Sequence, residues 1–239
     1  MSFSKIYFIL HQPQLSENIG ACARALKNFN FKNLFLIKPR VSYPNDKILA
    51  TSVGAKDIIK KSKIFSDLET SLKKIDYLIA TTSRFRNKNI KHITINELQK
   101  INFNKNIAFL FGSEASGLSN KEISYANCTL QIPTNPNFKS LNLSHSVIIV
   151  CQIVANILKS KKVKYARSNK VKTASKLEVQ AMVKFCVDTL ENLNFFKPAE
   201  KKPIMLENLK SIFYKMDLSK KEIRILSSVF ATLSKKKAD

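Results

Sequence analysis

Short apolar runs recur over the first 158 residues and alternate with segments of helical periodicity. These runs are mostly continuous rather than alternating, which is typical of parallel strands covered on both faces. Strands and helices that alternate along a chain predict an α/β domain with a mostly parallel sheet. The predicted strands are Ile6–Leu10, Leu34–Ile37, Tyr77–Thr81, Ile107–Phe111 and Thr129–Ile132.

Several helices carry a start signal, in which Ser or Thr is followed three residues later by Glu. In such a capping box each side chain accepts a backbone N–H that the helix leaves unpaired. Because each pair precedes an apolar periodic segment, together they indicate where helices begin. The pairs are Ser66/Glu69, Thr94/Glu97, Ser119/Glu122, Ser175/Glu178 and Ser219/Glu222.

The helix predicted over residues 141–158 is apolar nearly all round, which indicates that it is buried. We expect a second subunit to cover one of its faces. Residues 159–175 are rich in Lys and Arg, which predicts an exposed basic linker. Amphipathic patterns over 176–194, 204–216 and 220–235 predict three more helices. We therefore expect an α/β domain over 1–158, a linker over 159–175 and a small helical C-terminal domain over 176–239.

Composition excludes several classes of protein. No run of about 18 uncharged apolar residues occurs, so we expect no membrane span. The first residues lack the layout of a signal peptide. The four cysteines and three histidines have no paired spacing, which argues against a structural zinc site and a disulfide scaffold. We expect a cytoplasmic protein without a bound metal.

The formal net charge of +24 indicates a polyanionic partner, either nucleic acid or an acidic membrane face. A coding bias toward lysine and asparagine is an alternative explanation for many of the lysines. The rare arginines are therefore more informative, because a guanidinium offers a fixed fork of donors. They are Arg24, Arg40, Arg84, Arg86, Arg167 and Arg224.

Two polar segments follow predicted strands. The first, Asn18–Arg24, places Gly20 one helical turn before Arg24, which would leave open space beside the arginine stem. That arrangement suits a guanidinium facing a phosphate or ribose, although an exposed arginine beside an unrelated glycine is the alternative. The second, Thr81–Arg86, lies at the carboxyl end of a strand, where α/β sheets bind ligands. An ordinary polar loop is its alternative.

Two further loops, over 111–118 and 132–144, each end an apolar run and enter a helix. The first holds Gly112 and Gly117, half of the four glycines in the chain. In a chain with so few glycines, each is expected where the backbone needs a positive φ or comes close to other atoms. These loops therefore predict a ligand pocket. The chain contains neither a Gly-x-Gly-x-x-Gly fingerprint nor a P-loop.

Individual residues of these two loops have alternative roles. Glu114 could accept hydrogen bonds from a ribose or amine, or it could stabilise the start of the next helix. Ser140 and Asn142 open the apolar helix, where backbone N–H groups face a ligand. A capping role for Ser140 alone is the alternative.

In their order and spacing, three blocks of this chain resemble the SPOUT superfamily of RNA methyltransferases. The blocks are NIGACAR at 18–24, FGSEASGL at 111–118 and IPTNPNFKSLNLS at 132–144, within a resemblance over about residues 5–158. They are similar to the SpoU/TrmH class of ribose 2′-O-methyltransferases and within it to the TrmJ subgroup. The segment Thr81–Arg86 and the helical tail support that subgroup.

The resemblance implies a SPOUT-type α/β knot, a deep trefoil knot with a mostly parallel sheet. Periodicity alone favours an unknotted, Rossmann-like sheet, because knots are nearly absent from proteins. The resemblance also implies a homodimer that binds S-adenosylmethionine in a bent shape within the knot loops. The cofactor-binding residues it implies are Thr81, Thr82, Ser83, Gly112, Leu118, Ile132, Ser140, Leu141 and Asn142.

The implied reaction moves a methyl group to a ribose 2′-oxygen, at the pyrimidine of nucleotide 32 in the tRNA anticodon loop. The implied catalytic residues are Arg24, which positions ribose and phosphate, Ser140, which assists deprotonation, and Asn18, which steadies the arginine segment. The residues expected to contact RNA are Arg24, Arg84, Arg86, Glu114, Lys161 and Lys162. Ser113, where relatives often have arginine, and Lys139 depart from the common pattern.

Three other functions compete with this one. A SPOUT methyltransferase that acts on rRNA shares the same motifs. A non-catalytic RNA-binding module would keep the fold and charge without binding cofactor. A membrane-surface protein is disfavoured, because the basic residues are spread over several segments rather than one amphipathic helix.

Overall fold

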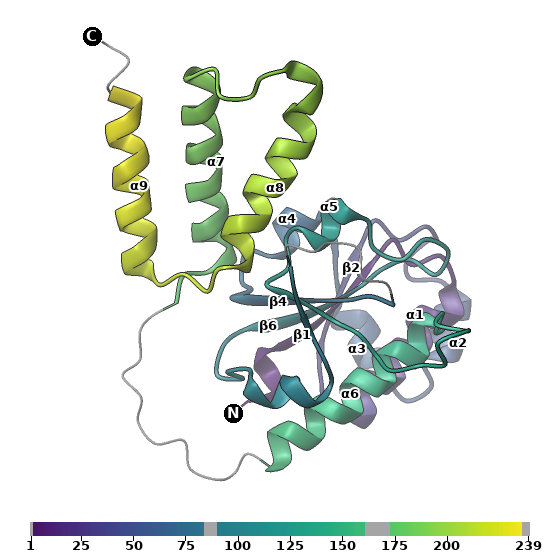
Figure 1. Ribbon diagram of the computed structural model, residues 1–239. Helices are drawn as coiled ribbons and strands as arrows, with labels where there is room; N and C mark the ends of the chain where they lie inside the picture. Colours follow the sequence, from purple (N-terminus) through teal and green to yellow (C-terminus); the bar gives the residue numbers. More distant parts are fainter. Residues whose placement is uncertain (1, 84–89, 161–172, 236–239) are drawn as a thin grey trace.

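The computed structural model of the protein describes residues 2–83, 90–160 and 173–235. Within these residues, seven strands form one sheet in the order β3-β2-β1-β6-β4-β7-β5, with every neighbouring pair parallel (Figure 1). The expected α/β class with a parallel sheet is confirmed. The strands are β1 Ile6–His11, β2 Asn33–Ile37, β3 Lys63–Phe65, β4 Tyr77–Thr81, β5 Lys91–Ile93, β6 Ile107–Phe111 and β7 Cys128–Leu130.

The strand order differs from the Rossmann-like sheet that periodicity alone favours. In a simple doubly wound sheet β4 would pair with β1, whereas here β6 lies between them. In the same way β7 lies between β4 and β5. The chain therefore returns twice to fill positions inside the sheet, and the carboxyl ends of β4, β6 and β7 become neighbours.

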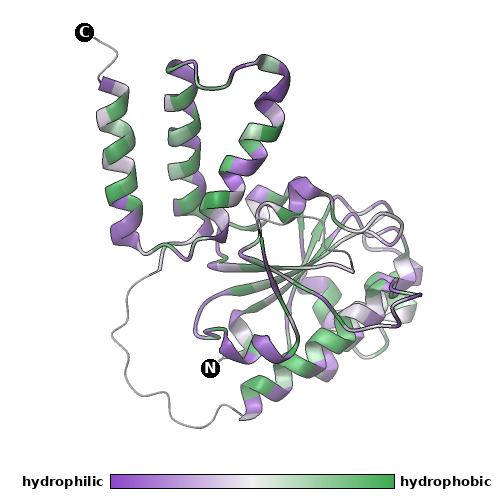
Figure 2. Ribbon diagram, viewed as in Figure 1, coloured by the Kyte–Doolittle hydropathy of each residue, from purple (hydrophilic) through white to green (hydrophobic). Residues whose placement is uncertain are grey.

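One face of the sheet is covered by α1 (Ser16–Asn28), α2 (Asp46–Thr51), α3 (Lys56–Lys61) and α6 (Leu143–Ser160). Figure 2 shows that α6 is hydrophobic over most of its length. By length and composition alone α6 could cross a membrane, and 44% of that segment is buried inside the protein. The core helix of a globular protein meets the same criterion, and here Val147, Val150 and Val154 are fully buried.

The opposite face is covered by α4 (Leu68–Ser71), α5 (Asn120–Ile123) and the C-terminal helices. The tail forms α7 (Lys176–Asn192), α8 (Lys202–Lys215) and α9 (Lys220–Lys235), close to the three helices predicted. Val179 and Met182 of α7 share one hydrophobic cluster with Ile75 and Tyr125 of the α/β part. Most of the expected linker, residues 161–172, lies outside the described residues. Short 3-10 turns cover Phe3–Lys5, Asn96–Lys100 and Ala199–Lys201.

The capping signals are correct at three helix starts and misplaced elsewhere. Ser119/Glu122, Ser175/Glu178 and Ser219/Glu222 open α5, α7 and α9 as expected. The prediction at Ser66 was wrong, because Asp67 caps α4 by accepting the Thr70 N–H at 2.7 Å. Thr94/Glu97 opens only a short 3-10 turn.

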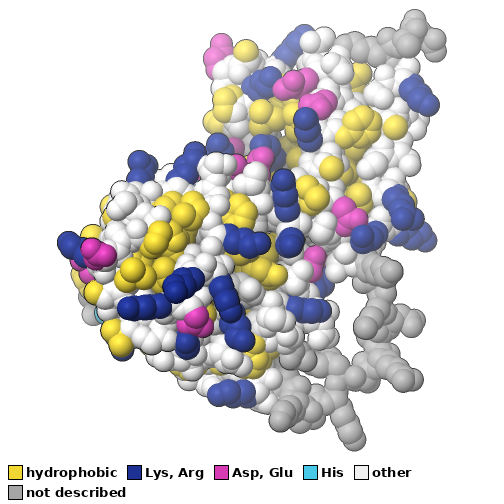
Figure 3. All heavy atoms as spheres, turned by 180° about the vertical axis from the view of Figure 1, so that it is seen from behind, with side chains coloured by type: hydrophobic (Ala, Val, Ile, Leu, Met, Phe, Trp, Pro, Cys, Tyr) yellow, Lys and Arg dark blue, Asp and Glu magenta, His cyan; other side chains and the backbone are white. Residues whose placement is uncertain are grey.

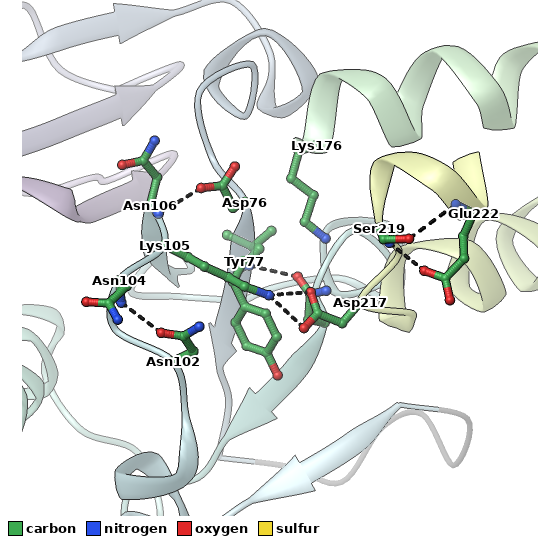
Figure 4. A network of polar contacts seen from close by, with 12 residues as sticks. Asp76, Tyr77, Asn102, Asn104, Lys105, Asn106, Lys176, Asp217, Ser219 and Glu222 are labelled. Carbon is green, nitrogen blue, oxygen red and sulfur yellow. Dashed lines mark hydrogen bonds and ion pairs between the residues drawn. The ribbon is translucent and has the colours of Figure 1, made fainter. Parts of the chain in front are cut away.

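A buried lysine fastens the tail to the amino ends of the strands (Figure 4). Lys176 is only 2% exposed, and its Nζ donates to the backbone oxygens of Tyr125 at 3.3 Å and Tyr214 at 3.1 Å. Nearby, Lys105 Nζ lies 2.7 Å from both carboxylate oxygens of Asp217. Burial is the main cause that lowers the pKa of Lys176, to about 7.

Replacing Lys176 with methionine is expected to flatten the pH dependence of stability between pH 7 and 9. An unfolded lysine has a pKa near 10.4, so between about pH 7 and that value unfolding takes up a proton. Wild-type stability should therefore rise with pH in this window, by roughly 1.4 kcal/mol per unit from this group. Urea unfolding of wild type and Lys176→Met at several pH values measures the difference.

The matched control is Lys184→Met, which changes an exposed lysine of the same helix. This variant should follow the wild-type pH profile. A wild-type slope that survives in Lys176→Met would show that another group titrates.

Candidate active site

A cavity of about 690 Å³ opens at the carboxyl ends of β4, β6 and β7. Three loops form its walls: residues 81–83, 112–118 and 132–143. Eight of the nine residues expected to bind a cofactor line it, and they come from all three loops. These are Thr81, Thr82, Ser83, Gly112, Leu118, Ile132, Ser140 and Leu141.

The loop after β6 folds back on itself because two glycines allow it. A Cβ on Gly112 would lie 2.2 Å from the carbonyl carbon of Gly117 and 2.4 Å from the Leu118 nitrogen. Gly117 has φ +67°, and its N–H donates to Ser113 O at 2.9 Å. Close approach and positive φ are the two reasons expected for glycine here. The two glycines thus let the loop close tightly on itself and form one wall of the cavity.

The loop after β4 is tied to the neighbouring strands. Thr81 Oγ1 donates to Leu110 O at 2.9 Å, and the Thr82 N–H donates to Leu130 O at 3.1 Å. These bonds fix the backbone of Thr81 and Thr82 relative to β6 and β7. Arg84 and Arg86, which follow, lie outside the described residues.

Asn142 is the expected cofactor residue that does not line the cavity. Its Oδ1 accepts the Ser144 N–H at 2.8 Å and the Ser144 hydroxyl at 2.7 Å, so Asn142 caps α6. The alternative of Ser140 as the cap is therefore wrong. Ser140 lies two residues earlier, exposed on the cavity wall.

A hydrogen-bonded chain of side chains joins the three sequence motifs. Asn142 Nδ2 donates to Asn18 Oδ1 at 3.0 Å, and Asn18 Nδ2 donates to Glu114 Oε1 at 2.8 Å. Glu114 also accepts the backbone N–H groups of Gln14 at 2.9 Å and Leu15 at 3.2 Å. The carboxylate thus stabilises the start of α1, which precedes it in the chain, rather than the helix that follows.

Replacing Glu114 with glutamine is expected to lower the free energy of unfolding by about 2 kcal/mol. The amide can accept at only one oxygen, so its NH₂ group would face at least one backbone N–H donor. Hydrogen bonds to a charged acceptor contribute roughly 1.5–3 kcal/mol each, and an unpaired donor adds a penalty. Urea unfolding monitored by circular dichroism measures the change.

Glu17→Gln is the matched control. Glu17 lies on the same helix start, is half exposed, and makes only a 3.7 Å contact with Lys47. Such a pair contributes roughly 0–1 kcal/mol. Equal losses in Glu114→Gln and Glu17→Gln would contradict the role given to the Glu114 carboxylate.

Arg24 lies exposed on α1 and is not part of the cavity wall. The expectation that Gly20 leaves space beside it was wrong. A Cβ on Gly20 would lie 2.0 Å from Thr51 Oγ1 and 2.6 Å from Ile48 O. Gly20 therefore lets α2 pack directly on α1, one turn before the exposed Arg24. Asn18, one and a half turns earlier, links α1 to the cavity loops.

Several cavity residues were not assigned a role from the sequence. Ser113 and Ser116 place their hydroxyl oxygens 2.8 Å apart on the wall formed by the β6 loop. Phe138 and Lys139 of the third loop also line the cavity. The sequence held one signal for Phe138: it is an aromatic residue in a stretch of Pro, Asn and Lys, where turn residues otherwise dominate.

The described residues contain neither a metal-binding cluster nor an exposed cysteine that could act as a nucleophile. Within that part of the chain, no group of three or more His, Cys, Asp or Glu side chains could hold a metal ion. Cys22, Cys128, Cys151 and Cys186 are free and buried. Burial raises the pKa of the Cys128 thiol to about 11, which disfavours the nucleophilic thiolate.

Comparison with known proteins places this cavity in a family. The sequence profile of the SpoU rRNA Methylase family matches residues 5–152, which contain the three cavity loops. The chain belongs to the SpoU methylase family. It is also similar, at 30% identity over 97% of this chain and 96% of the relative, to a tRNA (cytidine-2′-O-)-methyltransferase TrmJ of Sulfolobus acidocaldarius. An uncharacterized tRNA/rRNA methyltransferase, LasT of Escherichia coli, is 34% identical over 64% of this chain and 69% of its own length.

Solved structures of SpoU methylases share the fold. TrmJ from Z. mobilis superposes with a TM-score of 0.84 at 28% identity, over 95% of this chain and 98% of that one. The SpoU methyltransferase AviRb from Streptomyces viridochromogenes, solved with AdoMet, has a TM-score of 0.54 at 16% identity over 64% of this chain and 57% of its own. The expected SPOUT-type α/β fold class and the methyltransferase assignment are confirmed.

Proposed function

We propose that this protein transfers a methyl group from S-adenosylmethionine to a ribose 2′-oxygen of tRNA. The observation that carries the proposal is that eight of the nine residues expected to bind cofactor line one cavity, inside the region matched by the SpoU family. The cavity volume falls within the roughly 300–1,000 Å³ that small-molecule sites occupy. The tight Gly112–Gly117 turn gives this cavity a wall of defined shape.

The cofactor, when bound, supplies an activated methyl group, and the protein supplies position. We assign cofactor binding to Thr81–Ser83, Gly112, Leu118, Ile132, Ser140 and Leu141. Ser140 is exposed on this wall, where its hydroxyl can hydrogen-bond the ribose 2′-hydroxyl and assist loss of its proton. Arg24 binds the ribose and its phosphate, and Asn18 orients α1 through Glu114. A guanidinium offers five N–H donors and no acceptor atom, so Arg24 positions oxygens and does not take up the proton.

The proposed substrate is the pyrimidine nucleotide at position 32 of the tRNA anticodon loop. Relatives named TrmJ that align over nearly the whole chain support tRNA and 2′-O-methylation: one is named for cytidine, another for cytidine, uridine and adenosine. Arg84, Arg86, Lys161 and Lys162, which we assign to RNA contacts, lie outside the described residues. Glu114 would contribute indirectly, because its oxygens already accept three N–H groups.

The surface charge suits a polyanionic substrate. Figure 3 shows Lys and Arg side chains spread over both the α/β part and the tail on one face, with fewer Asp and Glu. If about six lysines contact phosphates, affinity should fall as roughly the fifth power of salt concentration.

We propose that the active form is a cytoplasmic homodimer. Ile148 of α6 is 39% exposed and Leu15, before α1, is 50% exposed, although α6 is otherwise a core helix. Large apolar side chains exposed on α6 and just before α1 are available for a second subunit to cover. We also propose the division into residues 1–158, 159–175 and 176–239, with the tail joined to the α/β part by shared core.

Labelled S-adenosylmethionine and unmodified tRNA test the proposal directly. We expect label in RNA, and after nuclease digestion we expect it in a 2′-O-methylated pyrimidine of the anticodon loop. Label in rRNA fragments but not in tRNA would favour the rRNA alternative. RNA binding without cofactor binding would favour the non-catalytic module.

A further inference from the structure

An exposed aromatic side chain stands at the cavity wall. Phe138 is 72% exposed, the highest value among the large apolar side chains that the structure describes. Exposed phenylalanines also occur in the tail, at Phe185 and Phe195, but neither lines the cavity. Single exposed apolar residues are common, so it is the combination of exposure, aromatic ring and location that needs a physical reason.

The loop around Phe138 holds a defined shape. The Phe138 N–H donates to Asn135 O at 3.0 Å, and the Asn137 N–H donates to Asn135 Oδ1 at 2.9 Å. Pro133 and Pro136 restrict the same stretch of backbone. The ring is therefore carried by a fixed turn, and a ligand that binds it meets a platform that needs little ordering.

We propose that Phe138 is a stacking platform for an unpaired nucleobase of the substrate RNA, next to the ribose that receives the methyl group. This inference rests on the proposed function. Proteins recognise RNA loops by splaying bases and stacking them on aromatic side chains. Phe138 offers a π-face on the wall of the cavity, and the neighbouring Lys139 offers a positive charge to a phosphate.

The exposure of Phe138 leaves room for RNA beside the cofactor. Phe138 is a residue of the cavity wall with 72% of its surface exposed, so a second ligand can reach it beside the one that the cavity holds. Phenylalanine has no hydrogen-bonding group, so stacking on it tolerates any base. The platform would therefore position the loop without choosing between cytidine and uridine.

Binding of fluorescent tRNA to Phe138→Ala tests the inference. We expect the dissociation constant for tRNA to rise by about 5- to 150-fold, the range that corresponds to loss of one base–aromatic stack. The dissociation constant for S-adenosylmethionine should stay within about twofold of wild type. Phe138→Tyr keeps the ring and should restore tRNA binding, whereas Phe138→Leu keeps apolar surface without a ring and should not.

Val53→Ala is the matched control, because Val53 is 65% exposed and lies outside the cavity wall. It should bind tRNA and cofactor as wild type does. tRNAs with a single abasic site in the anticodon loop then locate the stacked base. At that position, removing the base should weaken binding to wild type but not further weaken binding to Phe138→Ala.

Three results would overturn the inference. Unchanged tRNA binding in Phe138→Ala would exclude stacking. An equal loss of cofactor affinity would show that the ring covers the cofactor, and a change of oligomeric state by sedimentation would show a subunit contact. Failure of the proposed function is separate, because it would show as absent methyl transfer by the wild-type protein.

Discussion

Replacing Gly112 with alanine is expected to abolish cofactor binding and to lower stability by on the order of 3 kcal/mol. The new Cβ would lie 2.2–2.6 Å from backbone atoms of Gly117 and Leu118, and backbone cannot move aside as the end of a flexible side chain can. The turn after β6 would have to open, and it forms one wall of the cavity. Calorimetric titration with S-adenosylmethionine and urea unfolding measure the two effects.

Gly117→Ala separates this clash from ordinary backbone strain. Gly117 has φ +67° but nothing within 4 Å of the position a Cβ would take. A side chain in that conformation costs roughly 1–2 kcal/mol, without forcing the turn open. We expect weakened but measurable cofactor binding. Gly112→Ala protein that binds cofactor normally would mean that the turn is not the cofactor wall.

Replacing Arg24 with alanine is expected to lower kcat by about 10²- to 10³-fold, the loss typical when a positioned donor to the reacting groups is removed. Cofactor affinity should stay unchanged, because Arg24 is exposed on α1 and does not line the cavity. Single-turnover methyl transfer to tRNA and titration with S-adenosylmethionine separate the two quantities.

Two variants test whether the loss in Arg24→Ala comes from the missing positive charge or from a change to the surface of α1. Arg24→Lys keeps the positive charge but loses the planar fork, so it should remain defective. Lys27→Ala, one turn further along α1, removes an exposed ion pair with Asp57 and should keep near-normal turnover. Near-normal kcat in Arg24→Ala would remove Arg24 from the proposed mechanism.

The sequence predicted the parts of the fold that depend on local pattern. Continuous apolar runs marked five strands, and three capping boxes marked the starts of α5, α7 and α9. Strands β3 and β5 were missed, because each has three residues, begins with lysine and lies at an edge of the sheet. Such short edge strands carry too little apolar pattern to predict.

Contacts between distant segments account for what the sequence did not predict. Glu114 binds Gln14, 100 positions away in the chain, so its role in holding α1 could not be read from its neighbours. Gly20 is explained by Ile48 and Thr51 of α2 rather than by Arg24. The cavity itself was predictable, because most of its wall residues fall within the segments 81–86, 111–118 and 132–144, but the exposure of Phe138 on the third of them was not.

The tail and the cavity lie at opposite ends of the strands. Lys176 hydrogen-bonds to backbone beside the starts of β4 and β7, whereas Thr81 is the last residue of β4 and Gly112 follows the end of β6. A strand of five residues is roughly 17 Å long. An RNA that touches both ends of the strands must therefore extend over several nucleotides, so a short oligonucleotide can occupy one end only. Contacts with the tail thus distinguish a large RNA from a short oligonucleotide that carries the same reacting ribose.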